Sequence, residues 1–197
     1  MALAPRAFAR RTWLASSVLA LTITGCVSTS TASPTPTDAV SVLGCQDVIA
    51  SEATPPSGSS IVLDSVALPT GRALQASPTG DSNPNEKLFA KDGLLIRRGA
   101  AFDLVVPEAW RGRLAVGWGS LGKPTSHLRI PGCRPTTRMP SSGRWVLSDD
   151  WLAYPGGYSV PRASCVSLVV RAGQTERTVQ IGVGAPCPGQ SPPPPPA

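Results

Sequence analysis

The chain has 197 residues, of which 18 are Lys or Arg and 12 are Asp or Glu, giving a net charge of +6. Three of the basic residues, Arg6, Arg10 and Arg11, lie in the first 25 positions, so the remainder carries 15 basic against 12 acidic residues, or +3. Those remaining cations are scattered among acids, whereas nucleic-acid binding needs clustered cations. The composition therefore argues against a nucleic-acid partner.

The first 25 residues have the layout of a secretory signal. A basic stretch is followed by an apolar run from Trp13 to Ile23 and then by the small residues Thr24 and Gly25. The apolar run is about half of the ~20 residues that a membrane-spanning helix needs. The segment predicts export, with residues 1–25 as the signal peptide, and not a permanent membrane span.

Cys26 follows this segment directly. The stretch Ile23, Thr24, Gly25 and Cys26 resembles the lipobox of bacterial lipoprotein precursors at every position. The resemblance implies cleavage before Cys26, a diacylglycerol on its thiol, and an anchor on the outer face of the bacterial cell membrane. The alternative is a plain secreted protein whose cysteine happens to lie near the cleavage point.

The ends of the remaining chain have compositions that do not favour folding. Residues 27–38 are mostly Ser, Thr and Pro, which bury too little apolar surface to offset the entropy of ordering. We therefore predict a flexible tether over residues 26–40. The Pro-rich segment 189–197 predicts a disordered polyproline tail, and the stretch between, 41–188, suits a single domain.

Four cysteines remain once Cys26 is assigned to lipid: Cys45, Cys133, Cys165 and Cys187. An even number in an exported chain predicts two disulfides, with three possible connectivities. We favour Cys165–Cys187, because both lie near the open end of one predicted hairpin, and Cys45–Cys133 then remains. The wide cysteine spacings and the single His of the chain do not favour a zinc site, and we expect no metal or cofactor.

Short β-branched runs between turn residues recur along residues 41–188. The predicted strands cover 60–68, two strands within 93–107, 112–119, 127–130, 143–147, 157–161 and a hairpin over 165–184. Eight or nine such strands favour an all-β fold, an Ig-like antiparallel β-sandwich. Residues 69–87 are expected to form a long loop.

The predicted hairpin is the clearest element. Its apolar residues alternate in register on both strands, as expected for one buried face: Val166, Leu168 and Val170, then Val179, Ile181 and Val183. The stretch "GGYSVPRASCVSLVV" leads into it. This stretch resembles small β-rich lipoproteins and secreted proteins of high-GC Gram-positive bacteria, which implies a fold type and no activity.

Two sequence patterns resemble known functional motifs, but neither has the sequence context that its motif requires. Gly117, Gly119 and Gly122 fit G-x-G-x-x-G, but Pro124 stands where the phosphate-binding helix should begin, so we interpret them as turn residues and expect no nucleotide.

A catalytic triad is equally weakly supported. It would combine His127 with Ser120 or Ser126 and with Asp149 or Asp150. No G-x-S-x-G motif accompanies these residues, so His127 is interpreted as structural or exposed, and no catalytic residue is predicted.

Aromatic residues concentrate between positions 110 and 158: Trp110, Trp118, Trp145, Trp151, Tyr154 and Tyr158. Large aromatics usually pack in cores, and Trp118 occupies a strand position expected to be buried. Trp151, Tyr154 and Tyr158 lie in "DDWLAYPGGY", a Gly- and Pro-rich segment that we expect to be an exposed loop. These three are the candidate ligand-binding residues.

The sequence thus predicts a non-catalytic, membrane-anchored surface lipoprotein that acts as an interaction or structural module and docks another envelope protein. The alternative is a carbohydrate-binding module that holds cell-wall polysaccharide on the aromatic loop. An enzyme is the least favoured class.

Overall fold

The computed structural model describes residues 40–79, 87–119, 122–134 and 150–195, within one compact unit that spans Pro36–Ala197. Strands make up 51% of the structure and helical turns 5%, which confirms the all-β prediction. No helix among them is long and apolar enough to cross a membrane. Cys26, Trp145, Ser120, Asp149 and the strand predicted over 143–147 lie outside the described residues, as does nearly all of the predicted tether.

Fourteen short strands in three sheets are described, more than the eight or nine expected. Sheet A has the order β1-β10-β8-β13-β14. Its strands are β1 (Ser41–Val42), β8 (Ala101–Val105), β10 (His127–Pro131), β13 (Ser164–Ala172) and β14 (Thr175–Val183). β1 pairs with β10 in parallel, and the other neighbours are antiparallel. Burial alternates along β8 and β10, so one face of sheet A meets the core and the other meets solvent.

Sheets B and C are joined by a continuous run of chain. Sheet B has the order β2-β11-β7-β4-β3 and sheet C the order β5-β6-β12-β9. The strands of sheet B are β2 (Ala50–Glu52), β3 (Ser60–Val62), β4 (Val66–Leu68), β7 (Leu94–Arg97) and β11 (Trp151–Tyr154). Those of sheet C are β5 (Ser77–Pro78), β6 (Leu88–Lys91), β9 (Ala115–Trp118) and β12 (Gly156–Val160). Only Pro155 separates β11 from β12. Two short 3-10 turns, η1 (Cys45–Asp47) and η2 (Glu108–Trp110), complete the elements.

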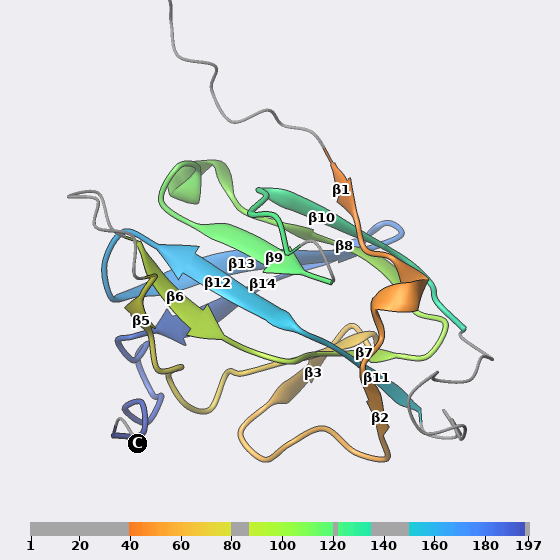
Figure 1. Cartoon of the computed structure of the whole chain (residues 1–197), viewed down its shortest axis with the longest axis horizontal. Coiled ribbons are helices and arrows are strands. Elements are labelled where there is room, and N and C mark those ends of the chain that lie inside the picture. The colour runs from red at the N-terminus through yellow and green to blue at the C-terminus, as the bar shows by residue number, and fades with distance from the viewer. Residues whose placement is uncertain (1–39, 80–86, 120–121, 135–149, 196–197) are drawn as a thin grey trace, which may run out of the picture. The chain divides into compact units, whose positions relative to one another are not determined.

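One hydrophobic cluster draws residues from all three sheets. In Figure 1, sheet C lies in front of the β13–β14 hairpin of sheet A. Leu168 of sheet A, Tyr158 of sheet C and Leu152 of sheet B are all fully buried in the cluster. Sheets that bury their inner faces against a shared core are the arrangement of a β-sandwich, so the predicted fold class holds although the strands are divided among three sheets.

The predicted hairpin over residues 165–184 is confirmed as β13 and β14. Val166 pairs with Ile181, and Leu168 pairs with Val179, as the alternating pattern requires. The turn between them consists of Gly173 and one further residue, and Gly173 has a φ of 59°, a left-handed conformation in which glycine avoids the steric cost of a Cβ.

The single strand predicted over residues 60–68 is instead the hairpin β3–β4. Leu63 and Asp64 form its turn with φ angles of 48° and 51°, and the Ser65 amide donates to the Val62 carbonyl. The Arg97 guanidinium donates to the Asp64 carboxylate at 2.7 Å and to its carbonyl at 2.9 Å. The turn has no glycine, which is why the sequence pattern did not reveal it.

Two segments expected to be loose are attached to the domain over part of their length. Leu74 donates to the Gly182 carbonyl at 2.8 Å, and Ala73 donates to the Ser191 carbonyl at 2.9 Å. Residues 72–78 are therefore structured. Leu74 is hydrogen-bonded to β14 of sheet A, and Ser77–Pro78 form β5 of sheet C. Ser191 belongs to the predicted tail, so the described start of that tail is held against the domain.

Candidate functional site

The expectation of an exposed aromatic loop is wrong. Trp151, Tyr154 and Tyr158 are 3%, 0% and 0% exposed, because they lie in strands and not in a loop. Tyr154 and Tyr158 point into the main core. Trp151 packs with Ala67 and Leu95 in a separate small cluster, and the Arg97 guanidinium lies 4.9 Å from its ring centroid. None of the three presents a surface for stacking.

The glycines that indicated a loop serve close packing of the backbone. A Cβ on Gly156 would lie 2.1 Å from the Gly117 carbonyl oxygen, and one on Gly157 would lie 2.0 Å from the Ala90 carbonyl oxygen. Both glycines lie in β12, the strand paired on both sides within sheet C. Pro155 lies between two strands, where its missing N–H removes no ladder hydrogen bond.

Both predicted disulfides are present. Cys45 is bonded to Cys133 and Cys165 to Cys187, with Cα–Cα distances of 5.3 and 4.9 Å. The first joins η1, close to the start of the described chain, to the residues after β10. The second joins the start of β13 to the segment after β14, as the hairpin interpretation required.

Of the three glycines of the G-x-G-x-x-G pattern, Gly117 lies within β9 and not in a turn as expected, whereas Gly119 and Gly122 follow that strand. Gly119 has a φ of 94° and Gly122 a φ of 43°, and the Gly122 amide donates to the Gly119 carbonyl. Such positive φ angles favour glycine for the backbone conformation alone, so these glycines need no bound nucleotide to explain them.

The outward face of sheet A carries a row of charged side chains across four neighbouring strands. Asp103 of β8 pairs with Arg129 of β10 on one side and with Arg171 of β13 on the other, and Arg171 in turn pairs with Glu176 of β14. The row therefore alternates in sign. At its edge, Val42 of β1 pairs with Arg129 and is 63% exposed.

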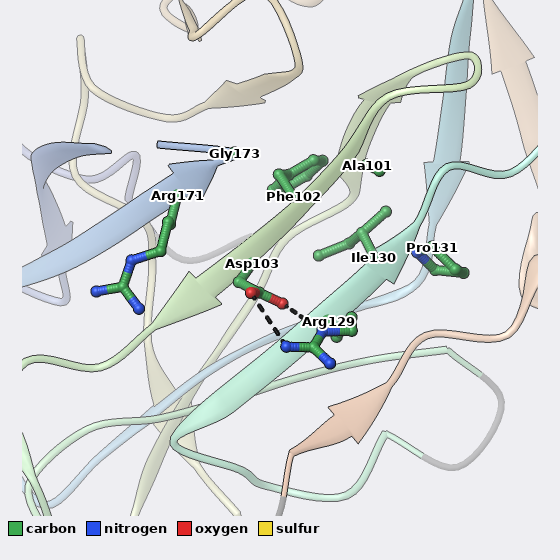
Figure 2. A pocket seen from close by; sticks show the side chains of 8 residues that line it. All are labelled: Ala101, Phe102, Asp103, Arg129, Ile130, Pro131, Arg171 and Gly173. Carbon is green, nitrogen blue, oxygen red and sulfur yellow. Dashed lines mark hydrogen bonds and ion pairs between the residues drawn. The ribbon is translucent and has the colours of Figure 1, made fainter. Parts of the chain in front are cut away.

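A shallow groove of about 330 Å³ lies along this row, lined by Phe102, Asp103, Arg129, Pro131 and Arg171 among others. Figure 2 shows the Asp103 and Arg129 side chains meeting, while the Arg171 guanidinium extends away from them. Arg129 Nε donates to Asp103 Oδ1 at 3.0 Å and Arg129 Nη2 donates to Oδ2 at 3.4 Å. Arg171 donates to Glu176 at 3.1 Å.

Asp103 lies between the two arginines of the row. Partial burial alone would raise its pKa, but the hydrogen bond and charge of Arg129, with a further contribution from His127, outweigh burial and hold the pKa of Asp103 below its usual range. His127 Nε2 lies 3.4 Å from Asp103 Oδ1. Among the described residues, the acid that faces His127 is thus Asp103, and not the Asp150 considered from the sequence; Asp149 lies outside the described residues.

Asp92 and Tyr158 form a second polar group, at the inner side of sheet C. Burial raises the pKa of Asp92 to about 7, and the facing Tyr158 hydroxyl partly opposes the rise. The contact falls short of a full hydrogen bond, because Asp92 Oδ2 and the Tyr158 hydroxyl have no such partner among the described residues. The Trp118 indole donates to the Asp92 carbonyl at 3.0 Å, and its ring meets Tyr158 edge-on at 5.1 Å.

Tyr154, beside η1, is likewise a buried tyrosine near an acidic side chain. Burial, and then the charge of Asp47, raises the pKa of Tyr154 to about 12, so its phenol stays neutral over the physiological range. Its hydroxyl has no hydrogen-bond partner among the described residues. Both tyrosines therefore contribute mainly through packing.

Comparisons with protein-family models, with curated proteins and with solved structures gave no match to this chain. The outward face of sheet A is the candidate site that the geometry offers for recognition. Sequence reasoning missed it because its members come from four strands. The sign that could have revealed it is the charged residue at the central solvent-facing position of each of the two strands "AFDLV" and "HLRIP", Asp103 and Arg129.

Proposed function

We propose that this chain is an exported, non-catalytic binding module, anchored to the outer face of a bacterial membrane by lipid on Cys26, which docks a partner protein through the outward face of sheet A. Two disulfides within one small domain support export, because disulfides persist in oxidising compartments. The lipobox-like stretch that ends at Cys26 supports the anchor.

The observation that carries the docking surface is the alternating charge row. Arg129 and Arg171 are 54% and 47% exposed, and Asp103 between them is 19% exposed. Since the two arginines are separated by one intervening strand, their backbones lie about 10 Å apart. Charges fixed at such a spacing orient a partner and speed its association more than they add affinity. We therefore expect a partner whose acidic side chains oppose the two guanidinium groups.

The apolar edge of the same face favours a protein partner. Val40 and Val42 are 39% and 63% exposed, and Val42 adjoins Arg129. Apolar contact area beside fixed charges is the usual composition of a protein interface. Because β1 directly follows the predicted tether in the chain, this edge is also the part of the face connected to the anchor.

The test is site-specific photo-cross-linking in intact host cells. A photoreactive residue in place of Thr178, which is exposed on the outward face of β14, should yield one defined adduct in the membrane fraction. Arg129→Gln combined with Arg171→Gln should remove that adduct. The matched control is Arg177→Gln, because Arg177 is exposed on the same strand but pairs with the inward-facing Val170. An adduct that survives the double substitution, or is lost equally with the control, contradicts docking at this face.

A further inference from the structure

A second, larger groove lies where sheet C meets the segment before it and the C-terminal residues. Its volume is about 690 Å³, and its lining includes Arg72, Ser77, Phe89, Lys91 and Pro194. Ser77 of β5 and Pro194 near the end of the described chain both line the groove, and in Figure 1 the dark blue C-terminal segment runs below β5. This volume falls within the range of about 300–1,000 Å³ typical of small-ligand sites.

The walls of the groove are fixed by hydrogen bonds from both sides. The segment that carries Arg72 is bound to the C-terminal residues, since the Ser191 amide donates to the Gly71 carbonyl at 3.1 Å. The Gln190 side-chain oxygen accepts from the Cys187 amide at 3.0 Å, next to the Cys165–Cys187 disulfide. A groove held in this way loses little conformational freedom when a ligand binds.

Phe89 supplies an aromatic surface in the groove. It is 37% exposed and is the one aromatic among the large apolar side chains that the described part of the chain exposes. Its ring lies against Gly157 of the neighbouring strand, where a Cβ would come 2.9 Å from Phe89 Cζ. Ser77 and Ser159 are its cross-strand neighbours, so small side chains leave the ring open.

Two cations line the same groove as this ring. Arg72 and Lys91 are exposed, and neither side chain has a hydrogen bond or an ion pair in the part of the chain that the structure describes. Within the part of the chain that the structure describes, no acidic residue lines the groove, and the strands of sheet C contain none. The described lining of the groove therefore combines an exposed aromatic ring with two cations that have no partner among the described residues.

We infer that this groove binds an anionic sugar polymer. The apolar face of a sugar ring packs on Phe89, and the anionic group pairs with Arg72 and Lys91, the Arg72 guanidinium suiting carboxylate or phosphate by its planar fork of donors. The inference goes beyond the docking of a protein to sheet A. It rests on the proposed export, because an exported chain is the one that meets such polymers.

The test is calorimetric titration of the purified chain carrying Cys26→Ala. Oligogalacturonate should bind, whereas its fully methyl-esterified form, which has the same rings without charge, and polyglutamate, which has charge without rings, should bind at least about tenfold more weakly. A sugar-phosphate polymer distinguishes the source of the anion, since the tighter of the two charged polymers identifies carboxylate or phosphate. Raising the salt from about 0.05 to about 0.5 M should weaken binding, because exposed charges are screened.

Variants separate the two contributions. Phe89→Leu keeps an apolar cover over Gly157 but removes the flat ring, and should weaken oligogalacturonate binding about three- to tenfold. Arg72→Gln and Lys91→Gln should each weaken it about two- to fivefold. Matched controls are Ile61→Ala, which removes a half-exposed apolar side chain from sheet B, and Arg177→Gln, which removes an exposed cation from sheet A. All variants should unfold at the same urea concentration as the parent.

Three results would overturn the inference: no binding of either charged sugar polymer, equal binding of the methyl-esterified form, or equal binding of polyglutamate with no effect of Phe89→Leu. The measurement uses an unlipidated chain and no partner protein, so failure here is distinct from failure of the anchor or of docking at sheet A.

Discussion

Replacing Asp92 by Asn should change how the stability of the domain depends on pH. Asp92 lies between β6 and β7, facing the Tyr158 hydroxyl, and burial raises its pKa from 3.8 to about 7. Between these two values the folded state holds a proton that the unfolded chain has released. Stability is therefore undiminished below pH 3.8, falls as the pH rises, and has lost the full contribution above pH 7.

The size of the loss follows from the same pKa values. A rise from 3.8 to about 7 corresponds to about 4 kcal/mol. Because the side chain keeps some contact with solvent, we expect about 2–4 kcal/mol. Asn has nearly the shape of a protonated Asp and no charge. The Asp92→Asn variant should thus match the parent near pH 4 and exceed its stability by that amount near pH 8.

The assay is urea unfolding with the disulfides intact, followed by tryptophan fluorescence at several values between about pH 4 and pH 8. Asp64→Asn is the matched control, because the Asp64 carboxylate is 80% exposed. If the parent and Asp92→Asn lose stability in parallel over this range, or if the parent becomes more stable with rising pH while the variant does not, the assigned burial of Asp92 is wrong.

Three further predictions concern the scaffold and are measured by urea unfolding. Gly157→Ala should cost about 2–4 kcal/mol, because the new Cβ meets the facing strand, whereas Gly93→Ala, with open space at that position, should change stability by less than about 0.5 kcal/mol; equal effects would refute the close-approach argument. Replacing both cysteines of the disulfide at Cys133, which spans 88 positions, should cost about 4–5 kcal/mol, against about 3 for the disulfide at Cys187, which spans 22. The reverse order would contradict the loop-entropy account. Leu168→Ala should cost about 2–5 kcal/mol, since the side chain is fully buried, and a near-neutral result would contradict the core assignment.

The alternation of apolar and polar residues along short segments was sufficient to predict much of the fold. In the β13–β14 hairpin, the buried positions repeat every second residue on both strands, and the register that aligns them also brings Cys165 near Cys187. The fold class and the Cys165–Cys187 pairing could therefore be inferred from neighbouring residues, and Cys45–Cys133 followed by elimination.

The candidate sites depend on register between distant strands, and local patterns do not specify it. Asp103 meets Arg129 across β8 and β10, which are separated in sequence by β9. Gly157 looks like a turn residue in the sequence, but it marks close approach of backbones within a sheet. Phe89 has no sequence signal of exposure, because its face of sheet C is defined by the strands paired with β6.

The central claim is that a lipid on Cys26 holds this binding module at the membrane surface. The most direct test is the intact mass of the chain from the membrane fraction of its host, with and without Cys26→Ala. The proposal predicts an N-terminus at Cys26 that carries the mass of a diacylglyceryl group, and the loss of both this mass and membrane retention in the variant. An unmodified chain released into the medium, or a variant that stays in the membrane fraction, would contradict it.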